Sequence, residues 1–365
     1  MKLSCTKENL LAGLMTVGRI ASKNLTLPIL GNVLLRAEKG SLVLSATNLE
    51  VGVTTRVRGK ILADGAITIQ ARLLTDYIGL LENEKIELEA EGTTLRIAGE
   101  TSKTTIRGMS ADDFPIIPSV PHEGGFKVSA DVLRGGLEQV LFAAAQDATR
   151  PEISGVSFSI KGSVMTMAAT DSYRLAERTI PLKEPRKDLI TIMPTRALFE
   201  LVRIMPTDGD TQVFIGETQA LFVSDSIELS TRLIEGQYPD YTQIIPKSSS
   251  IEARVDTETF VKAVKTASLF CRSGINDVTV GLDPAAGTIA CAAANSELGE
   301  HQGSIPAKIT GGPVSVVFNY RYLLEGLSAI NAPSVVLGVT DSASPGIMKA
   351  EGAGGYLYII MPIRQ

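Results

Sequence analysis

The stretch Leu10-Leu11-Ala12-Gly13-Leu14 occurs three times along the chain, twice in altered form. Its counterparts are Leu133-Arg134-Gly135-Gly136-Leu137 and Phe260-Val261-Lys262-Ala263-Val264, and a short strand-like run precedes each of the three. Self-similarity at a fixed period is the mark of a repeat architecture. The sequence therefore predicts three copies of one structural unit.

Three further anchors follow each copy in the same order. One of them, Ala46-Thr47-Asn48, is echoed by Ala169-Thr170-Asp171 and by Ala294-Asn295-Ser296. Corresponding anchors lie about 120 residues apart, a regularity that is hard to obtain by chance. We predict three units that span residues 1–121, 126–247 and 251–365.

The pattern inside each unit indicates the α+β class. A strand leads to a helix of about ten residues, and alternating apolar and polar residues with Gly-rich turns then predict antiparallel strands. A second helix follows, so we expect each unit to pack two helices on an antiparallel sheet. The six predicted helical segments are 7–23, 72–82, 131–150, 196–205, 257–272 and 321–330.

The composition, 44% hydrophobic and 21% charged residues, is typical of a globular protein. Cys5, Cys271 and Cys291 form no C-x-x-C pair, so neither a disulfide framework nor a thiolate metal site is predicted. They are interpreted as buried small hydrophobic residues in a reducing cytoplasm. No apolar run approaches the roughly 20 residues of a membrane-spanning helix, and a cytoplasmic protein is expected.

The sequence contains no pattern that indicates catalysis. His122 and His301 have no metal-ligand spacing, and there is no phosphate-binding loop, dinucleotide fingerprint or nucleophile elbow. We therefore predict no catalytic residue, no metal and no cofactor. Three similar units without a shared catalytic set favour a non-enzymatic scaffold, although an enzyme with an unrecognised carboxylate site stays open as an alternative.

Several segments carry a resemblance to a known family. Thr26-Leu27-Pro28-Ile29-Leu30-Gly31-Asn32 and Ala169-Thr170-Asp171-Ser172-Tyr173-Arg174-Leu175-Ala176 are similar to segments of the bacterial sliding clamps, the beta subunits of DNA polymerase III. The terminal Tyr358-Ile359-Ile360-Met361-Pro362-Ile363-Arg364 matches another family segment. The likeness covers the whole chain and keeps the order of its motifs.

This resemblance implies a head-to-tail homodimer that closes into a ring of clamp domains. Such a ring encircles duplex DNA without sequence preference and tethers the replicative polymerase alpha subunit as a non-enzymatic processivity factor. A clamp loader, repair polymerases and other proteins with clamp-binding motifs would be further partners. The alternative is a triplicated scaffold that binds only proteins and does not encircle DNA.

The net charge of -5, from 35 basic and 40 acidic residues, speaks by itself against a nucleic-acid partner. The six predicted helical segments, however, together hold more basic than acidic side chains. A modestly positive lining within an acidic ring would attract DNA without binding it tightly. From charge and resemblance, the expected DNA contacts are Lys23, Asn24, Arg72, Gln146, Arg150 and Arg196.

The resemblance also implies a hydrophobic peptide pocket between the second and third units. Branched apolar side chains and a methionine suit an adaptable apolar slot, and Arg174 is expected at its rim as a donor. Ser172-Tyr173 replaces the Gly-His of many relatives, and Gln243 a position that is basic in some. The expected pocket residues are Ile153, Thr170, Tyr173, Arg174, Leu175, Pro239, Ile244, Ile360, Met361, Pro362 and Ile363.

The seam of the ring would join the first unit of one chain to the third unit of the other. By position, Thr104 and Ile106, on an expected edge strand, are assigned to one side of this seam. Leu269 and Phe270 are assigned to the other side. An edge strand that is paired across a seam avoids the aggregation hazard of an open edge.

Overall fold

The computed structural model describes residues 1–21, 27–38, 40–82, 85–118, 120–147, 149–352 and 354–364. They form two compact units. The first comprises Met1–Leu133 and Arg196–Leu233, and the second comprises Arg134–Thr195 and Ile234–Gln365. The predicted DNA contacts Lys23 and Asn24 lie outside the described residues.

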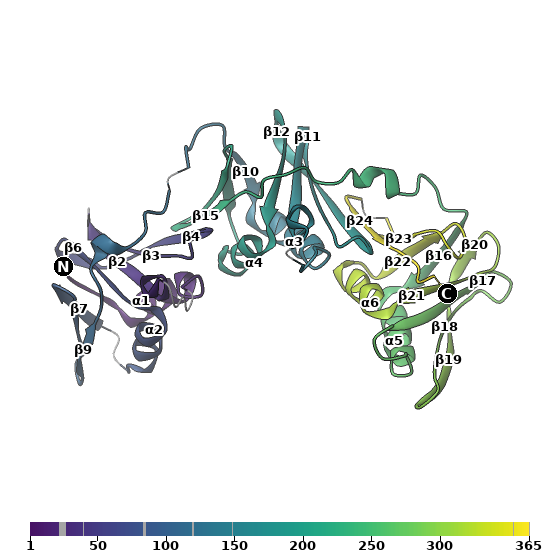
Figure 1. Ribbon diagram of the computed structural model, residues 1–365, viewed down its shortest axis with the longest axis horizontal. Coiled ribbons are helices and arrows are strands. Elements are labelled where there is room, and N and C mark those ends of the chain that lie inside the picture. The colour runs from purple at the N-terminus through teal and green to yellow at the C-terminus, as the bar shows by residue number, and fades with distance from the viewer. Residues whose placement is uncertain are drawn as a thin grey trace. The chain divides into compact units, whose positions relative to one another are not determined.

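The order of elements confirms the predicted repeat (Figure 1). Each repeat begins with a strand and a helix, continues with further strands and a second helix, and ends with three strands. The first repeat contains β1 (Lys2–Thr6), α1 (Lys7–Val17), β2 (Asn32–Glu38), β3 (Ser41–Thr47), β4 (Val51–Val57), β5 (Lys60–Ala63), β6 (Gly65–Gln70), α2 (Ala71–Leu80), β7 (Lys85–Glu91), β8 (Thr94–Ala98) and β9 (Lys103–Arg107). Short 3₁₀ turns, η1 (Pro28–Gly31) and η2 (Ala111–Asp113), complete it.

In the second repeat, two long strands take the place of β2 to β6. Its elements are β10 (Phe126–Ser129), α3 (Ala130–Leu141), η3 (Pro151–Ile153), β11 (Gly155–Thr170), β12 (Arg174–Pro194), α4 (Thr195–Ile204), β13 (Asp210–Ile215), β14 (Gln219–Ser224), β15 (Ile227–Arg232) and η4 (Tyr241–Ile244). The third repeat contains β16 (Ile251–Asp256), α5 (Thr257–Ser268), β17 (Asp277–Asp283), β18 (Thr288–Asn295), β19 (Gly299–Pro306), β20 (Lys308–Thr310), β21 (Val314–Asn319), α6 (Tyr320–Ala329), β22 (Ser334–Val339), β23 (Gly346–Ala350) and β24 (Tyr356–Ile360).

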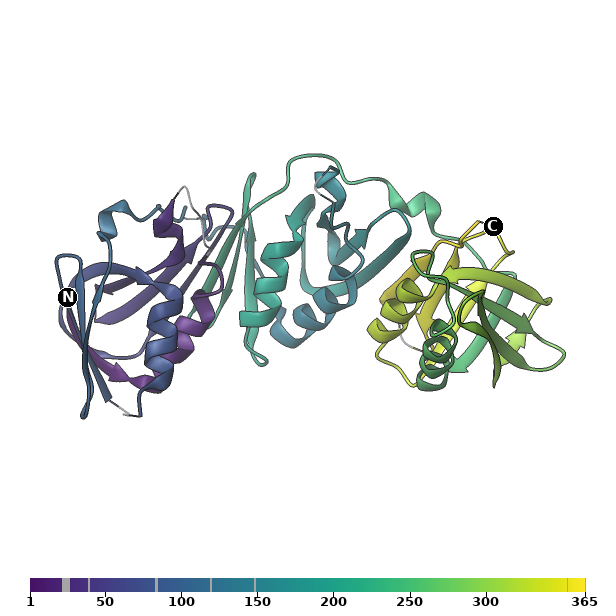
Figure 2. The same ribbon diagram turned by 60° about the horizontal axis from the view of Figure 1, so that its bottom comes forward.

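The repeated first stretch is a helix face that lies very close to a sheet. Leu10 and Leu14 are one helical turn apart and fully buried, as are Leu133 and Leu137 in α3 and Phe260 and Val264 in α5. A Cβ atom at Gly13 would lie 2.5 Å from a methyl group of Val57 in β4. Glycine at this position therefore lets α1 pack directly on the strand. Figure 2 shows α1 (purple) and α2 (blue) beside each other against the strands of the first repeat.

The Ala-Thr-Asx anchor builds the same hairpin turn twice. Thr47 Oγ1 donates to the Val51 carbonyl (3.0 Å), and Asn48 Oδ1 accepts from the Val51 amide (2.8 Å). In the second repeat, Thr170 Oγ1 donates to the Arg174 carbonyl (2.6 Å), and Asp171 takes the role of Asn48. A polar side chain that satisfies the turn's backbone groups explains why these residue types recur.

All strand pairs in the described sheets are antiparallel, as predicted, and the sheets continue from one repeat into the next. β15 of the second repeat pairs with β4 of the first, with Ile227 opposite Thr55. β12 of the second repeat pairs with β24 of the third, with Leu175 opposite Ile359. The sheet orders are β5-β1-β7-β8-β9 and β10-β13-β14-β15-β4-β3-β2-β6 in the first compact unit, and β11-β12-β24-β23-β22-β16-β20 and β19-β18-β17-β21 in the second. The middle repeat thus shares a sheet with each neighbour, which explains why three repeats form two compact units.

Every predicted helix begins within one residue of its observed start, but three predicted ends are wrong. α1 ends at Val17 rather than 23, α3 at Leu141 rather than 150, and α5 at Ser268 rather than 272. The amide of Gly18 donates to the Leu14 carbonyl and closes α1, and Ala143 donates to the Val140 carbonyl in a tighter turn after α3.

The three cysteines are free and buried, as the sequence predicts. Burial raises the pKa of the Cys5 thiol to about 11, so this side chain stays a protonated, apolar core group at neutral pH. No helix in the described part of the chain combines the length and the apolar character that crossing a bilayer requires.

Candidate peptide-binding and nucleic-acid sites

A hairpin turn and the C-terminal run meet within the second compact unit. β12 begins at Arg174, which lies opposite Ile360 in β24. Beyond the strand, the Met361 amide donates to the Tyr173 carbonyl (2.9 Å), and the Ile363 amide donates to the Val317 carbonyl (2.8 Å). The structure therefore brings together two groups of residues that are almost 200 positions apart and that the family resemblance assigns to one pocket.

Arg174 is the centre of a hydrogen-bond network where the hairpin turn and the C-terminal run meet. Its Nε donates to Asp171 (3.0 Å), its Nη2 donates to the Phe142 carbonyl (2.7 Å), and its Nη1 pairs with Glu325. Only 8% of the residue is exposed. Arg174 thus does not stand at a rim as a free donor; it ties the hairpin turn to α6 and to the end of α3.

Aromatic rings enclose the same guanidinium. Its central carbon lies 4.4 Å from the centroid of Tyr322 and 5.4 Å from that of Phe142. Tyr173, 63% exposed, stacks on Tyr322 with centroids 6.5 Å apart. Burial and the nearby Asp171 carboxylate raise the pKa of Tyr322, so its hydroxyl remains neutral and the ring stays a good cation–π partner.

The predicted pocket residues fall into two layers. Ile153, Thr170, Leu175 and Ile360 are buried, and their apolar groups belong to the core. Tyr173, Pro239 and Ile244 are exposed, and Met361, Pro362 and Ile363 are partly exposed. The buried layer supports the outer layer, so a bound peptide would touch the second group directly.

Tyr241 connects the two buried clusters that support this surface. One cluster contains Ile153, Ile192 and Tyr238, and the other contains Ala168, Leu175 and Ile359. Tyr241 packs against both. Its burial and the adjacent Glu177 carboxylate raise the pKa of its hydroxyl, which therefore stays protonated.

Three arginines occupy equivalent places at the starts of helices. Arg72, Arg196 and Arg321 are each the second residue of their helix, in α2, α4 and α6, and all three are exposed. A cation at a helix N-terminus opposes the helix dipole and costs about 0.3–1 kcal/mol. The same unfavourable arrangement therefore occurs once in each repeat. Arg72 also forms an i,i+4 ion pair with Asp76 (3.6 Å).

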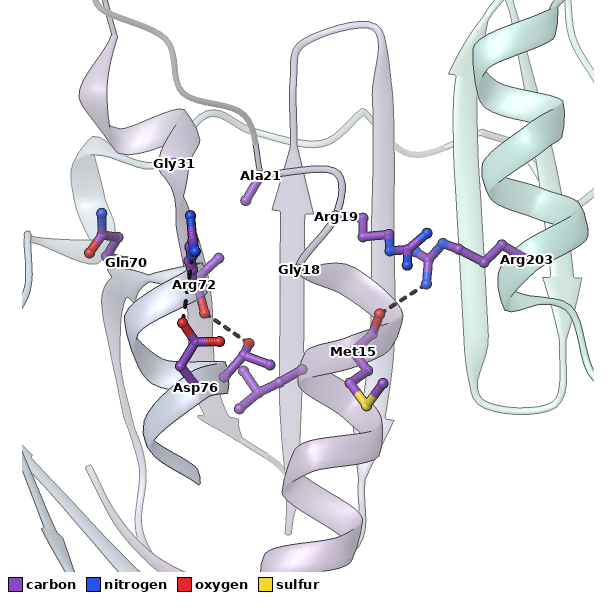
Figure 3. A pocket seen from close by; sticks show the side chains of 12 residues that line it. Met15, Gly18, Arg19, Ala21, Gly31, Gln70, Arg72, Asp76 and Arg203 are labelled. Carbon is purple, nitrogen blue, oxygen red and sulfur yellow. Dashed lines mark hydrogen bonds and ion pairs between the residues drawn. The ribbon is translucent and has the colours of Figure 1, made fainter. Parts of the chain in front are cut away.

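A cleft of about 680 Å³ lies beside Arg72 in the first compact unit (Figure 3). Arg19, Arg72 and Arg203 contribute three guanidinium groups to its lining. Arg203 is already engaged: it donates to the carbonyls of Met15 (3.0 Å) and Thr16 (3.1 Å) and pairs with Glu200 (2.7 Å). Because α1 has no basic residue in its last turn, Arg203 supplies the positive charge that a helix C-terminus favours. Arg19 and Arg72 are the exposed cations of the cleft.

The other predicted DNA residues differ in their surroundings. Gln146 is exposed after α3, and Arg196 is exposed on α4. Arg150 donates from Nη1 to the Ser172 hydroxyl (3.0 Å) and pairs with Glu152 (3.4 Å), so it lies beside the hairpin turn that precedes β12. Within the described residues, no cluster of three or more His, Cys, Asp or Glu side chains could hold a metal ion.

The predicted seam residues lie at sheet edges and helix ends. β9, with Thr104 and the buried Ile106, is an edge strand of its sheet, as the sequence predicts. Leu269 directly follows α5 and is 69% exposed. Phe270 stacks on His301 of the edge strand β19, with ring centroids 5.9 Å apart.

Family models of the DNA polymerase III beta subunit match almost the whole chain. The N-terminal domain model matches residues 1–118, the central domain model 127–240 and the C-terminal domain model 242–364. A beta sliding clamp from Synechococcus elongatus is 31% identical over 372 residues, which cover 100% of this chain and 99% of that protein. The chain belongs to the DNA polymerase III beta subunit family.

Solved structures of this family have the same fold. A DNA polymerase sliding clamp from Bacillus subtilis superposes with a TM-score of 0.96 at 26% identity and covers 100% of this chain and 99% of that one. A sliding clamp from Pseudomonas aeruginosa bound to griselimycin gives a TM-score of 0.95 at 26% identity, with both chains fully covered. The chain therefore consists of three beta-clamp domains with helices on antiparallel sheets.

Two departures from the usual pattern of the clamp family now have a structural description. Ser172 has a φ of +77°, a conformation that glycine adopts without strain. A glycine would therefore be suited to this position. Gln243 donates to Asp240 (2.8 Å), and hydrogen bonds from Thr242 and Gln243 lower the pKa of that carboxyl.

Three residues that surround Arg174 are absent from the sequence prediction. Phe142, Tyr322 and Glu325 surround Arg174 but come from α6 and from the residue after α3. The signal available was weak: Tyr322 and Glu325 lie one turn apart on a predicted helix, which places them on one face without indicating what that face meets.

Proposed function

We propose that the chain acts as the sliding clamp of a replicative DNA polymerase. Two copies close head to tail into a ring around duplex DNA, and the ring tethers the polymerase as a processivity factor without catalysing a reaction. The observation that carries this proposal is the full-length match to beta sliding clamps together with three equivalent domains in one chain. The scaffold that binds only proteins is not favoured.

The finer assignments belong to the same proposal. The three domains span 1–121, 126–247 and 251–365, and the protein works in the cytoplasm. Its partners are the polymerase alpha subunit, the clamp loader, repair polymerases and other proteins with clamp-binding motifs. The clamp loader supplies the ATP-dependent opening for which this chain has no phosphate-binding loop.

DNA contact is assigned to exposed cations on or next to the helices. Arg72 and Arg196 at helix starts, with Gln146 and Arg150, would meet phosphates, and Lys23 and Asn24 would add a loop contact. Phosphate contacts position a protein without reading sequence, which suits a ring that slides. The intramolecular pairs of Arg72 and Arg150 keep each contact weak, because a phosphate must compete with Asp76 and Glu152.

Replacing Arg72 and Arg196 together by glutamine is expected to weaken duplex binding and its dependence on salt. Each lost phosphate contact should make the slope of log K against log salt shallower by about 0.9. Equilibrium binding to duplex DNA over a range of NaCl concentrations measures this slope. Arg254→Gln, on β16 and paired with Glu351, is the matched control and should leave the slope unchanged. An unaltered slope in the double variant would remove these arginines from the interface.

Peptide binding is assigned to the outer layer, which we name the Tyr173 surface. It consists of Tyr173, Pro239, Ile244, Met361, Pro362 and Ile363. Ile244, Met361 and Pro362 would contact an apolar peptide, and Leu175 and Ile360 would hold the floor. Arg174 positions this floor through its network rather than as a rim donor. Exposed apolar side chains around a few fixed polar groups are typical of groove-type peptide recognition.

Ring closure is assigned to two edges of opposite charge. β9 carries the exposed Lys103 and Arg107, and the β18–β19 hairpin carries the exposed Glu297 and Glu300. A head-to-tail seam joins two different surfaces, so complementary edges on one chain fit this symmetry. Thr104, Ile106, Leu269 and Phe270 form the apolar part of the proposed seam.

Leu269→Asp is expected to separate the ring into single chains. A carboxylate placed in an apolar seam loses its hydration without gaining a partner. Light scattering should give 38.8 kDa for the variant and about twice that mass for the wild type. Leu62→Asp, on the opposite edge strand β5 and 55% exposed, is the control and should stay dimeric. A dimeric Leu269→Asp variant would move the seam elsewhere.

A further inference from the structure

Ile116, on the segment that follows η2, is left almost fully exposed by the described part of the chain. Ile116 is 91% exposed, the highest value among the large exposed hydrophobic side chains of the described residues. The residues on either side are held in place: Phe114 is buried with Ile29 and Leu34, and Ile117 packs against the same cluster. The backbone is thus fixed on the sheet while Ile116 points away from the core.

A groove of about 340 Å³ lies beside this segment in the first compact unit. Its floor is the outer face of β2, β3 and β4, and its wall is the 114–117 segment. A Cβ atom at Gly52 in β4 would lie 2.7 Å from a methyl group of Ile117, so glycine there allows the wall to lie directly on the strand. We define the Ile116 groove by its apolar and basic lining: Leu34, Arg36, Val43, Phe114, Ile116 and Ile117.

The groove contains a cation without a partner in the described structure. Arg36 lies opposite Val43, and Val43 lies opposite Arg56, so two arginines flank one valine on the same face. Arg56 is paired with Glu228 (3.1 Å). Arg36 has no such pair among the described residues, and Glu38 is the only acidic residue in the groove lining.

The internal repeat relates this groove to the surface that is proposed to bind peptides. Ile116-Ile117-Pro118 has the same sequence as Ile244-Ile245-Pro246 and holds the same place at the end of its repeat. Both segments follow or contain a 3₁₀ turn, and in both the second isoleucine packs on a buried cluster while the first is exposed. The same local construction therefore occurs once on each compact unit.

We propose that the Ile116 groove is a second peptide-docking site, which takes a short extended segment of a partner protein. The segment would place one large apolar side chain against Ile116 and Val43 and one acidic side chain on Arg36. The volume suits one or two side chains rather than a folded surface. The unpaired guanidinium selects a carboxylate, because charge-assisted contacts with arginine are the strong polar contacts at such sites.

Titration with a dye-labelled, end-capped peptide of leucine, serine, phenylalanine and one aspartate tests this proposal. The wild type is expected to bind two peptides per chain. Ile116→Asp should remove one site and Ile244→Asp the other, and the exposure of both side chains makes the two variants safe for folding. Arg36→Glu should weaken the Ile116 site at least tenfold, and a twin peptide with lysine in place of aspartate should recover the loss.

Two results would overturn the proposal. One is an Ile116→Asp variant that binds the same number of peptides as the wild type. The other is a wild-type protein whose solution mass exceeds that of a dimer, together with a lower mass for Ile116→Asp. That result would show that a second copy of the chain covers the groove. The proposed Tyr173 surface is tested separately: if it is wrong, Ile244→Asp will not change the number of bound peptides.

Discussion

Replacing Arg174 by alanine is expected to destabilise the second compact unit by about 3 kcal/mol and to abolish peptide binding at the Tyr173 surface. The change leaves the carboxylates of Asp171 and Glu325 and the Phe142 carbonyl without their shared donor. Removing one partner of a buried ion pair costs about 3–5 kcal/mol, and the lower value applies because the Glu325 side chain is 49% exposed. Chemical denaturation and peptide titration measure the two effects.

A matched control separates this network from the loss of an arginine as such. Arg254 pairs with Glu351 at 3.8 Å, and both side chains are about half exposed. Exposed pairs contribute about 0–1 kcal/mol, so Arg254→Ala should change neither stability nor peptide affinity appreciably. If Arg174→Ala bound peptide with wild-type affinity, the network would be irrelevant to the surface above it.

Met361→Asp is expected to weaken peptide binding about 100-fold, which corresponds to about 3 kcal/mol, while the fold and the dimer stay intact. The side chain of Met361 is partly exposed, and its structural contribution is the backbone hydrogen bond to Tyr173, which aspartate retains. A carboxylate at this position would have to be desolvated by an apolar peptide. Fluorescence anisotropy with a labelled peptide measures the affinity.

The same substitution at Met15 provides the control. Met15 is 59% exposed on α1 in the other compact unit, so Met15→Asp should leave peptide affinity unchanged. Unchanged affinity in Met361→Asp itself would show that the C-terminal run does not contribute to the peptide surface.

Local signals in the sequence predicted most of the fold. The buried pair Leu10 and Leu14 follows from helical spacing, and the Ala-Thr-Asx anchors follow from the hydrogen bonds of one hairpin turn. Helix starts were predictable because a strand end and a cap residue mark them, as Thr6 does by accepting from the Asn9 amide before α1. Helix ends were less predictable than helix starts. The end of α1 depends on contacts such as those of Gly18 with Leu14 and of Arg203 with Met15.

Long-range pairing was beyond the sequence pattern. Nothing local indicates that β15 joins β4, or that β12 joins β24, since strand partners are chosen by tertiary packing. The peptide surface was expected only through the family resemblance, and the burial of Arg174 was missed. Its partners Phe142, Tyr322 and Glu325 come from elements whose meeting depends on the whole fold.

A ring that encircles duplex DNA is linked to it by topology rather than by affinity. Rings loaded onto a nicked circular plasmid should stay bound through gel filtration and should leave once a restriction enzyme linearises the plasmid. The mild overall charge of -5 predicts this loss, because the free surface holds DNA only weakly. Equal retention on the circular and the linear plasmid would contradict the sliding-ring account.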